Sequence, residues 1–294
     1  MRVTDKSIAN NSLATLQSNL ERLTKLSQQA SSGLKINAPG DDPAGAVKTL
    51  QLKGTLKDND QYARNSVTGT AWLGQTDNAM SSMGDVVTRA HEIAMEMANG
   101  TYNASDRAGA VNEVTQLTAQ MVQLGNTQVG GKYIFGGFKD DAPPFSTTGA
   151  FTGTEDAVSI NVGDNTNVAI NYSGGKLLKG TGGGIDIFAE LQKLSTALST
   201  NSQSGVEATL NTLDTSLTQI TSARSDAGSR MNRLDNVTAD RDSANINISK
   251  SLSDTQNIDV VKVYSELANQ QTAYQAALST TAKISQLSLL NYLK

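Results

Sequence analysis

The stretch Ser12–Ala46, SLATLQSNLERLTKLSQQASSGLKINAPGDDPAGA, decides how this chain folds. Its leucines recur at intervals of three and four residues: Leu13, Leu16, Leu20 and Leu23. This spacing places apolar side chains along one face of a helix and predicts a coiled-coil seam. Pro39 and Pro43 end the helix. Asp41 or Asp42 can cap a second helix that has Pro43 in its first turn.

The same periodicity continues outward over a second helical region, from about Ala44 to Met97. Its seam alternates intervals of four and three residues: Trp72, Thr76, Ala79, Met83, Val86, Ala90, Ile93 and Met97. The run 98–106, ANGTYNASD, predicts a turn, and a third amphipathic helix follows it.

The composition changes at Gly130 and Gly131. From there to about Gly184 the chain is rich in Gly, Thr, Asn and Asp. Short alternating runs lie at Tyr133–Phe135, Ala157–Val162 and Val168–Tyr172. All five phenylalanines of the chain lie between Phe135 and Phe188. This pattern predicts short β-strands with tight turns, and therefore a small β-rich domain.

Amphipathic helices return after this segment and continue to the end of the chain. The last of them carries apolar residues at roughly helical spacing: Leu267, Tyr274, Leu278, Ile284, Leu287 and Leu290. From Leu267 onward the only charged side chains are Lys283 and Lys294. A solvated helix normally carries more charge, so the helix is expected to be buried, either within its own domain or among partner subunits.

The expected fold is mainly α. We expect a long antiparallel helical coiled-coil or bundle rod, built from both chain arms, with the small β-rich domain inserted at the far tip. The predicted division is an N-terminal assembly helix (1–36), a first rod arm (37–130), a β-rich outer domain (131–184), a second rod arm (185–257) and a C-terminal assembly helix (258–294).

Composition excludes several functional classes. The chain has 294 residues, a formal charge of -4 and no block of basic residues, which disfavours nucleic-acid binding. No apolar run is long enough to span a membrane, and the N-terminus lacks the apolar segment of a cleavable signal peptide. Since there is no cysteine, disulfides and thiolate chemistry are excluded.

A search for catalytic or metal-binding motifs gives no candidate. His91 is the only histidine, and Met95 occupies the position where a zinc-protease helix would need a second one. Asp164 in GDNTN hints at a calcium loop, but turn chemistry accounts for these residues more simply. We therefore expect no enzyme activity, no metal and no cofactor.

Three blocks of the sequence resemble the flagellin superfamily. The first is Ser12–Ala46, with its leucine seam and the loop Asp41–Gly45. The second is Gly130–Phe145, GGKYIFGGFKDDAPPF, and the third is Gln270–Leu293, QQTAYQAALSTTAKISQLSLLNYL. The second and third blocks favour the hook-associated, hook–filament junction branch of the family, because flagellins usually end with a different apolar run.

This resemblance implies a structural subunit of the bacterial flagellum. The expected partners are copies of the chain in a ring oligomer, a neighbouring hook-associated protein, flagellin and a cytoplasmic export chaperone. The resemblance also implies export in an unfolded state through the flagellar type III channel, without a cleaved signal, to an extracellular location. We expect the residues before about Asn37 and after about Ile258 to be disordered in the isolated monomer and to fold on assembly.

Two other functions remain open from the sequence. One is a flagellin that builds the filament itself. The other, from a different class, is an extracellular adhesin or carbohydrate-binding protein that acts through the β-rich domain.

Overall fold

The computed structural model describes residues 5–292 and confirms a mainly α-helical fold with a small strand region. The described elements are α1 (Asp5–Ser32), α2 (Pro43–Met97), α3 (Ala104–Gly125), β1 (Gln128–Val129), β2 (Lys132–Tyr133), β3 (Ser159–Gly163), β4 (Thr166–Ala169), α4 (Gly174–Leu178), α5 (Ile187–Ser199), α6 (Gln203–Gln256) and α7 (Val260–Tyr292). They divide between two compact units, each described separately below: unit 1 (1–58 and 243–294) and unit 2 (59–242).

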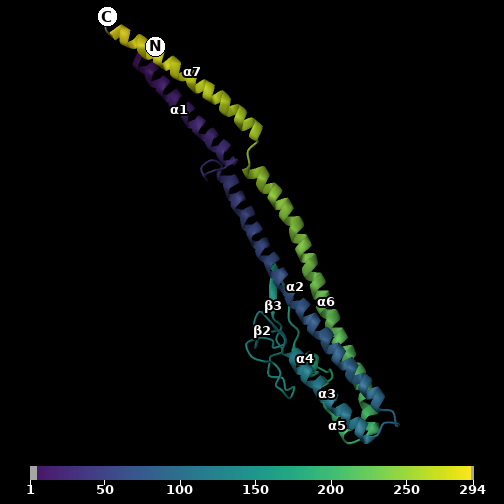
Figure 1. Ribbon diagram of the computed structural model, residues 1–294. Helices are drawn as coiled ribbons and strands as arrows, with labels where there is room; N and C mark the ends of the chain where they lie inside the picture. Colours follow the sequence, from purple (N-terminus) through teal and green to yellow (C-terminus); the bar gives the residue numbers. More distant parts are fainter. Residues whose placement is uncertain (1–4, 293–294) are drawn as a thin grey trace. The chain divides into compact units, whose positions relative to one another are not determined.

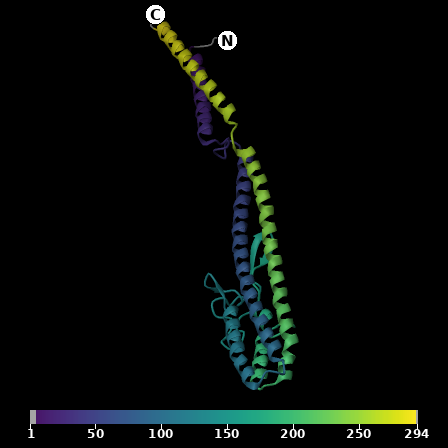
Figure 2. The same ribbon diagram turned by 45° about the vertical axis from the view of Figure 1, so that its right-hand side comes forward.

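In unit 1, helices α1 and α7 lie side by side in both views (Figures 1 and 2). The break between α1 and α2 lies next to the break between α6 and α7. The amide of Lys35 donates to the carbonyl of Gln256 at 2.7 Å, and that of Ile258 donates to the carbonyl of Gly33 at 3.1 Å. Leu34 and Asn257 thus form an antiparallel β-bridge, and the two helices leave it antiparallel to one another.

The α1–α7 pair gives each terminal helix a partner within the chain. Whether this pair persists in the isolated monomer stays a prediction. An isolated helical hairpin without a deep core is marginal in water.

Unit 2 contains a continuous hydrophobic core. The second seam predicted from the sequence is largely buried: Met83, Val86, Ala90 and Ile93 are each at most 3% exposed. These side chains pack in one cluster with buried residues of α3, α5 and α6. The regular spacing of four and three residues therefore located this core correctly.

The end of unit 2 where α2 gives way to α3 is fixed by polar contacts. Asn103 caps α3, since its side chain accepts from the amides of Ser105 and Asp106 and its own amide donates to Asp106. Arg107 is only 4% exposed and donates to the carbonyl of Met97 at 3.0 Å, and also to Asn99 and Asn201. One arginine thus connects the turn after α2 with the turn before α6.

Two short hairpins make up the strand region: β1 with β2, and β3 with β4. Several of the segment's residues share the helical core, including Phe135 and Phe145, which are at most 2% exposed. The rings of Phe145 and Phe188 lie 5.5 Å apart. The five-part division stays a prediction, but segment 131–184 folds directly onto the helices of unit 2.

The place of the β3–β4 hairpin differs from the expected far tip. Asn65 of α2 donates to the carbonyl of Asn161 at 2.7 Å, and the hydroxyl of Tyr62 donates to Asp164 at 3.1 Å. A Cβ on Gly69 would lie 2.5 Å from Ile160, so a glycine is needed for this close approach. The hairpin therefore packs against the part of α2 far in sequence from its end at Met97.

Candidate assembly interface

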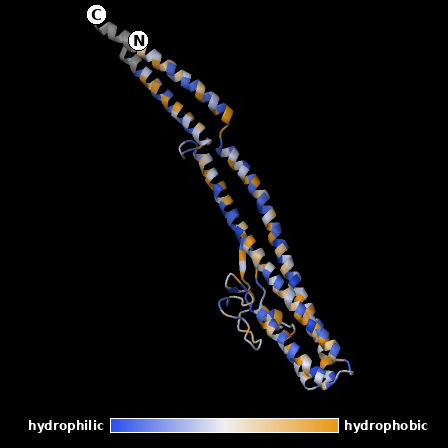
Figure 3. Cartoon of the chain, in the orientation of Figure 1, coloured by the Kyte–Doolittle hydropathy of each residue, from blue (hydrophilic) through white to orange (hydrophobic). Residues whose placement is uncertain are grey.

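The seam between α1 and α7 follows a strict spacing of four and three residues. On α1 the seam positions, all half-buried, are Ser12, Leu16, Asn19, Leu23, Leu26 and Ala30. On α7 they are Val263, which is buried, and Leu267, Gln270, Tyr274, Ala277 and Thr281, which are half-buried. This is the heptad pattern of a two-helix coiled coil. Figure 3 shows apolar and polar residues mixed along both helices.

The structure separates the predicted assembly residues into two groups. Leu16, Leu23, Leu267 and Tyr274 lie in the seam and are half-buried. Leu13, Leu20 and Leu278 point away from it, with 55%, 47% and 45% of their surface exposed. The side chains of Ile284, Leu287 and Leu290 lie outside the described residues. The predicted face is therefore wider than the seam, and part of it has no partner within the described chain.

A polar pair interrupts the seam. The amide group of Gln270 donates to the backbone carbonyl and to the side-chain oxygen of Asn19, both at 3.2 Å. A register shift would place one of these amides against leucine and leave it without a partner. Such pairs fix the register of a coiled coil at some cost in stability.

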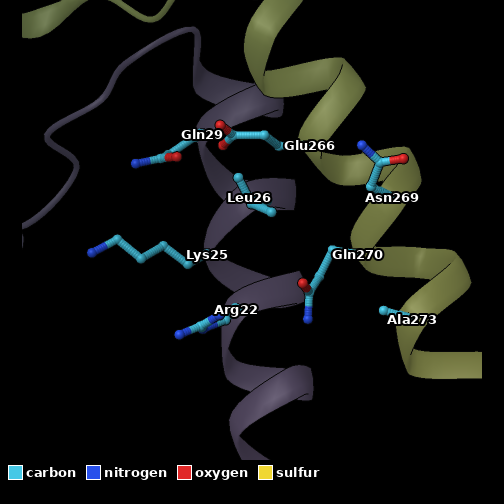
Figure 4. A pocket seen from close by; sticks show the side chains of 8 residues that line it. All are labelled: Arg22, Lys25, Leu26, Gln29, Glu266, Asn269, Gln270 and Ala273. Carbon is cyan, nitrogen blue, oxygen red and sulfur yellow. The ribbon is translucent and has the colours of Figure 1, made fainter. Parts of the chain in front are cut away.

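A shallow polar groove of about 570 Å³ runs along one side of the seam (Figure 4). Arg22, Lys25 and Gln29 line it from α1, and Glu266 and Asn269 line it from α7. A second groove further along the same pair is lined by polar and small residues, among them Thr15 and Thr280. Both grooves are open to the surface.

The predicted junction loop after α1 is held by Asp41. Its carboxylate lies 2.9 Å from the ammonium of Lys25 and accepts from the amides of Asn37 and Ala38 at 3.1 and 3.0 Å. The hydrogen bond from Lys25, followed by those from the two amides, lowers the pKa of Asp41 from 3.8 to about 2. Asp41 therefore ties the end of α1 to the loop.

Asp42 caps α2 and Pro43 is the first residue of the helix, which is one of the two arrangements that the sequence allowed. The carboxylate of Asp42 accepts from the amide of Gly45 at 3.0 Å, and α2 begins at Pro43. A Cβ on Gly45 would lie 2.6 Å from the side chain of Ile36. The loop thus folds back onto the first turn of α2.

The other predicted junction pair, Gly130 and Gly131, forms the two-residue turn between β1 and β2. Their φ angles are +59° and +83°, and Val129 pairs with Lys132 across the turn. Positive φ at both central positions is the requirement of a type I′ hairpin turn, which glycine meets without strain.

Many hydroxyl groups on α1 and α7 are satisfied by their own helix. Each of the following donates to the carbonyl four residues earlier, at 2.8 to 3.0 Å: Thr15, Thr24, Thr272, Thr280 and Thr281. These side chains therefore need no water or partner to complete their hydrogen bonds.

Among residues 5–292, no group of three or more His, Cys, Asp or Glu side chains could hold a metal ion. His91 is half-buried on α2. Asp164 lies in the β3–β4 turn beside Asn165, whose φ is +59°, as turn chemistry predicted. No helix in the described part of the chain is long and apolar enough to cross a membrane.

Comparison with known proteins shows that both arms of the chain match a known family. The bacterial flagellin N-terminal helical region matches residues 3–140, and the bacterial flagellin C-terminal helical region matches residues 210–293. The chain belongs to the flagellin family. Helices α1, α2 and α3 lie in the N-terminal region, and most of α6 and all of α7 lie in the C-terminal region.

Three relatives illustrate the range of this family. Flagellar hook-associated protein 3 of Escherichia coli is 26% identical over 293 residues, covering 92% of both chains. A flagellin of Halalkalibacterium halodurans is 26% identical over 275 residues, covering 91% of this chain and 90% of the flagellin. The structure of a putative flagellar hook-associated protein from Vibrio parahaemolyticus has the same fold, with a TM-score of 0.68 and 22% identity, covering 74% of this chain and 100% of that one.

Sequence reasoning missed other exposed apolar residues of unit 1 in this flagellin-family chain. Val261 of α7 is 82% exposed, Tyr264 is 54% exposed, and Leu50 of α2 is 74% exposed. Val261 and Tyr264 lie beside the α7 seam and were not singled out, because they adjoin Val260 and Val263 in the run VVKVY. The position of Tyr264 directly after the seam residue Val263 was a signal that could have found it, because such residues lie at the edge of a helix pair.

Proposed function

We propose that this chain is a subunit of the junction between the hook-associated proteins and the flagellin filament. In this role it forms a ring of copies in the extracellular flagellum, and it contacts a neighbouring hook-associated protein on one side and flagellin on the other. The family is one of structural flagellar proteins, and we propose no enzymatic role.

The observation that carries this proposal is the state of the α1–α7 pair. Both arms of a flagellin-family chain meet in it, yet Leu13, Leu20 and Leu278 stay exposed. Burial of one leucine stabilises by roughly 1.5–3 kcal/mol, so this pair has unused apolar surface that another subunit can cover. The similarity to hook-associated protein 3 along nearly the whole chain supports the junction role.

We also propose that the chain leaves the cell unfolded through the flagellar type III channel, with a cytoplasmic chaperone on its C-terminal region. Two features support this. The chain contains no cysteine, so it carries no thiol into an oxidising medium. The α1–α7 pair has only a thin seam, so it can stay open until assembly with little cost.

Localisation in intact flagella tests the proposal. The chain should carry a small tag between Thr147 and Thr148, which are both exposed, be detected with gold-labelled antibody and be examined by cryo-microscopy. A single band at the hook end is expected, and cells without the chain should keep their hooks but lose their filaments. Labelling along the whole filament, or normal filaments without the chain, would reject the junction role.

The second candidate is a filament-forming flagellin. It is favoured by the H. halodurans flagellin, which shares 26% identity with this chain. The same micrographs separate the two, since a filament subunit would repeat continuously from the hook to the distal end.

A further inference from the structure

The turn between α2 and α3 contains the only Asn-Gly dipeptide of the chain, Asn99–Gly100. Both residues are exposed and lie outside the two helices. An asparagine that precedes glycine is reactive in water. The backbone amide of the glycine can attack the side-chain carbonyl of the asparagine, and glycine has no side chain to hinder the approach. The turn therefore places a reactive dipeptide in contact with solvent.

The contacts of the Asn99 side chain favour this attack. Its Oδ1 accepts from the backbone amide and from the hydroxyl of Thr101, both at 3.1 Å. Two donors on one carbonyl oxygen stabilise the negative charge that develops there when a nucleophile adds to Cγ. Within residues 5–292 the amide of Gly100 donates no hydrogen bond, so no other contact competes for the attacking nitrogen.

A buried arginine contacts the second carbonyl that takes part, the backbone carbonyl of Asn99. Arg107 is 4% exposed, and its Nη2 donates to this oxygen at 3.2 Å. Its other donors bind the carbonyl of Met97 and the side chain of Asn201. None of these three partners is a carboxylate. A guanidinium that is buried without a counter-ion favours an anion that forms beside it.

We propose that Asn99 is a site of spontaneous deamidation and that Arg107 directs the product toward isoaspartate. In the first step a base, water or hydroxide, removes the amide proton of Gly100. The nitrogen then bonds to Cγ of Asn99, and the bond from Cγ to Nδ2 breaks. Nδ2 takes up a proton from water and leaves as ammonia. The product is a cyclic imide of Asn99 and Gly100, formed without any oxidation or reduction.

Water opens this imide at either of its two carbonyls. Addition at Cγ gives aspartate. Addition at the backbone carbonyl of Asn99 breaks the bond to the nitrogen of Gly100, which takes a proton from the water, and gives isoaspartate, in which the main chain runs through Cγ. Arg107 polarises the backbone carbonyl and lies beside the carboxylate that forms there. Thr101 polarises Cγ, but its donors are neutral and lie at the surface, and charge-assisted hydrogen bonds are about twice as strong.

The modification changes one corner of unit 2 with the age of the chain. It adds a negative charge and lengthens the main chain at Asn99, while Arg107 gains a carboxylate partner. The inference concerns the chemistry of this turn and does not depend on the proposed function.

Asn103 provides an internal control in the same turn. It is exposed, and its Oδ1 also accepts two hydrogen bonds, from the amides of Ser105 and Asp106. However, the residue that follows it is Ala104. Trypsin cleaves after Arg89 and Arg107, so a single peptide, 90–107, carries both asparagines.

Gly100→Ala is the matched variant. The φ angle of Gly100 is not among the positive ones, so alanine can adopt the same backbone. An added Cβ would meet only the exposed end of the Gln203 side chain, 3.3 Å from Oε1. Circular dichroism of the full-length variant checks that the fold is kept.

The rate is measured on the purified full-length chain, kept at about pH 8 and sampled over weeks. Mass spectrometry of peptide 90–107 follows the replacement of NH2 by OH, and electron-transfer fragmentation distinguishes isoaspartate from aspartate. Asn99 should deamidate at least about ten-fold faster than Asn103, and Gly100→Ala should slow Asn99 about ten-fold, because a Cβ restricts the approach. Similar rates at the two asparagines, or no effect of Gly100→Ala, would overturn the assignment of the site.

The role of Arg107 is measured by the ratio of isoaspartate to aspartate at Asn99. This ratio should be at least about three-fold higher in the folded chain than in the same chain unfolded in urea, since the charge-assisted hydrogen bond exists only in the fold. Arg107→Gln should lower the ratio toward that of the unfolded chain. The comparison in urea needs no variant, so it decides even where Arg107→Gln does not fold. An equal or lower ratio in the folded chain would show that Arg107 does not direct the opening.

Discussion

Unit 2 and unit 1 are built from the same kind of helix but bury their apolar side chains very differently. In unit 2 most core residues are less than 5% exposed and form one cluster. In the described part of unit 1, only Ile36 and Val263 are buried hydrophobic residues. Conversely, nine of the twelve large hydrophobic side chains that are exposed in the described residues belong to unit 1.

This contrast shows which apolar side chains the chain buries by itself and which it leaves exposed. Unit 2 layers several helices and the strand segment around shared side chains, so each apolar residue has neighbours on every side. Unit 1 has a two-helix seam whose members are mostly half-buried. A two-helix layer cannot enclose its own apolar residues, and its completion requires further helices.

The largest effect should come from the aromatic cluster of unit 2. Phe145 is 2% exposed, and its ring lies 5.3 Å from that of Phe151. Phe145→Ala is expected to lower the free energy of unfolding by about 3–5 kcal/mol, through lost burial and the cavity left behind. Urea titration of the purified full-length chain measures it.

Phe138 supplies the matched control, because it lies in the same segment and is 65% exposed. Phe138→Ala should change the unfolding free energy by less than about 0.5 kcal/mol. Similar losses from both variants would mean that the segment does not share the core of unit 2.

Hydrogen exchange sharpens the comparison within one molecule. Amides near Leu20 and Leu278 should exchange at least ~100-fold faster than those near Leu213, which is fully buried in α6 of unit 2. Mass spectrometry of the isolated chain gives both rates in one experiment. Equal protection in the two units would show that the α1–α7 pair is as stable as the core and needs no partner.

A seam substitution should act on unit 1 alone. Leu23→Ala removes a half-buried side chain from the α1–α7 seam and should weaken the pair by about 1–2 kcal/mol, less than a fully buried leucine would. Faster exchange is expected along α7, with unchanged rates around Met83 and Leu213. A change that spreads to α3 or α5 would contradict the separation of the two units.

The smallest effect concerns the loop at Asp41. Since the folded pKa of Asp41 is about 2, below its ordinary 3.8, the carboxylate stabilises the loop above about pH 4. That contribution is lost as the pH falls toward 2. In the unaltered chain, exchange at the amides of Asn37 and Ala38 should rise over this interval, after correction for intrinsic exchange. Asp41→Asn should remove the pH dependence, and Asp42→Asn should keep it.

The sequence predicted the helices and the core of unit 2 well, because long seams have a strict period. Met83, Val86 and Ala90 follow that period, and each is at most 2% exposed. The alternating runs Ala157–Val162 and Val168–Tyr172 overlap the observed strands Ser159–Gly163 and Thr166–Ala169. Ile134 and Phe135 were expected in a strand but serve as core residues of unit 2. A short apolar run has the same sequence pattern whether it forms a strand or packs onto helices, so the sequence could not distinguish the two.

The candidate interface could be predicted only as a broad face. Leucines three and four residues apart cover more of a helix than one partner can bury, so the sequence could not tell Leu16 from Leu20. The partner helix decides this, and its register depends on the distant pair Asn19 and Gln270.

The threonines of the terminal helices give this protein a surface that suits two environments. The hydroxyl groups of Thr24 on α1 and Thr272 on α7 each donate a hydrogen bond to a carbonyl of their own helix. In water the oxygen can still accept a hydrogen bond, so the isolated chain is wetted. When the helix packs against a neighbour, the threonine methyl group makes the contact. The hydroxyl donor keeps its hydrogen bond when water is removed. In the proposed role, in which the chain first travels alone and then packs with other subunits, such side chains need neither solvent nor a specific partner.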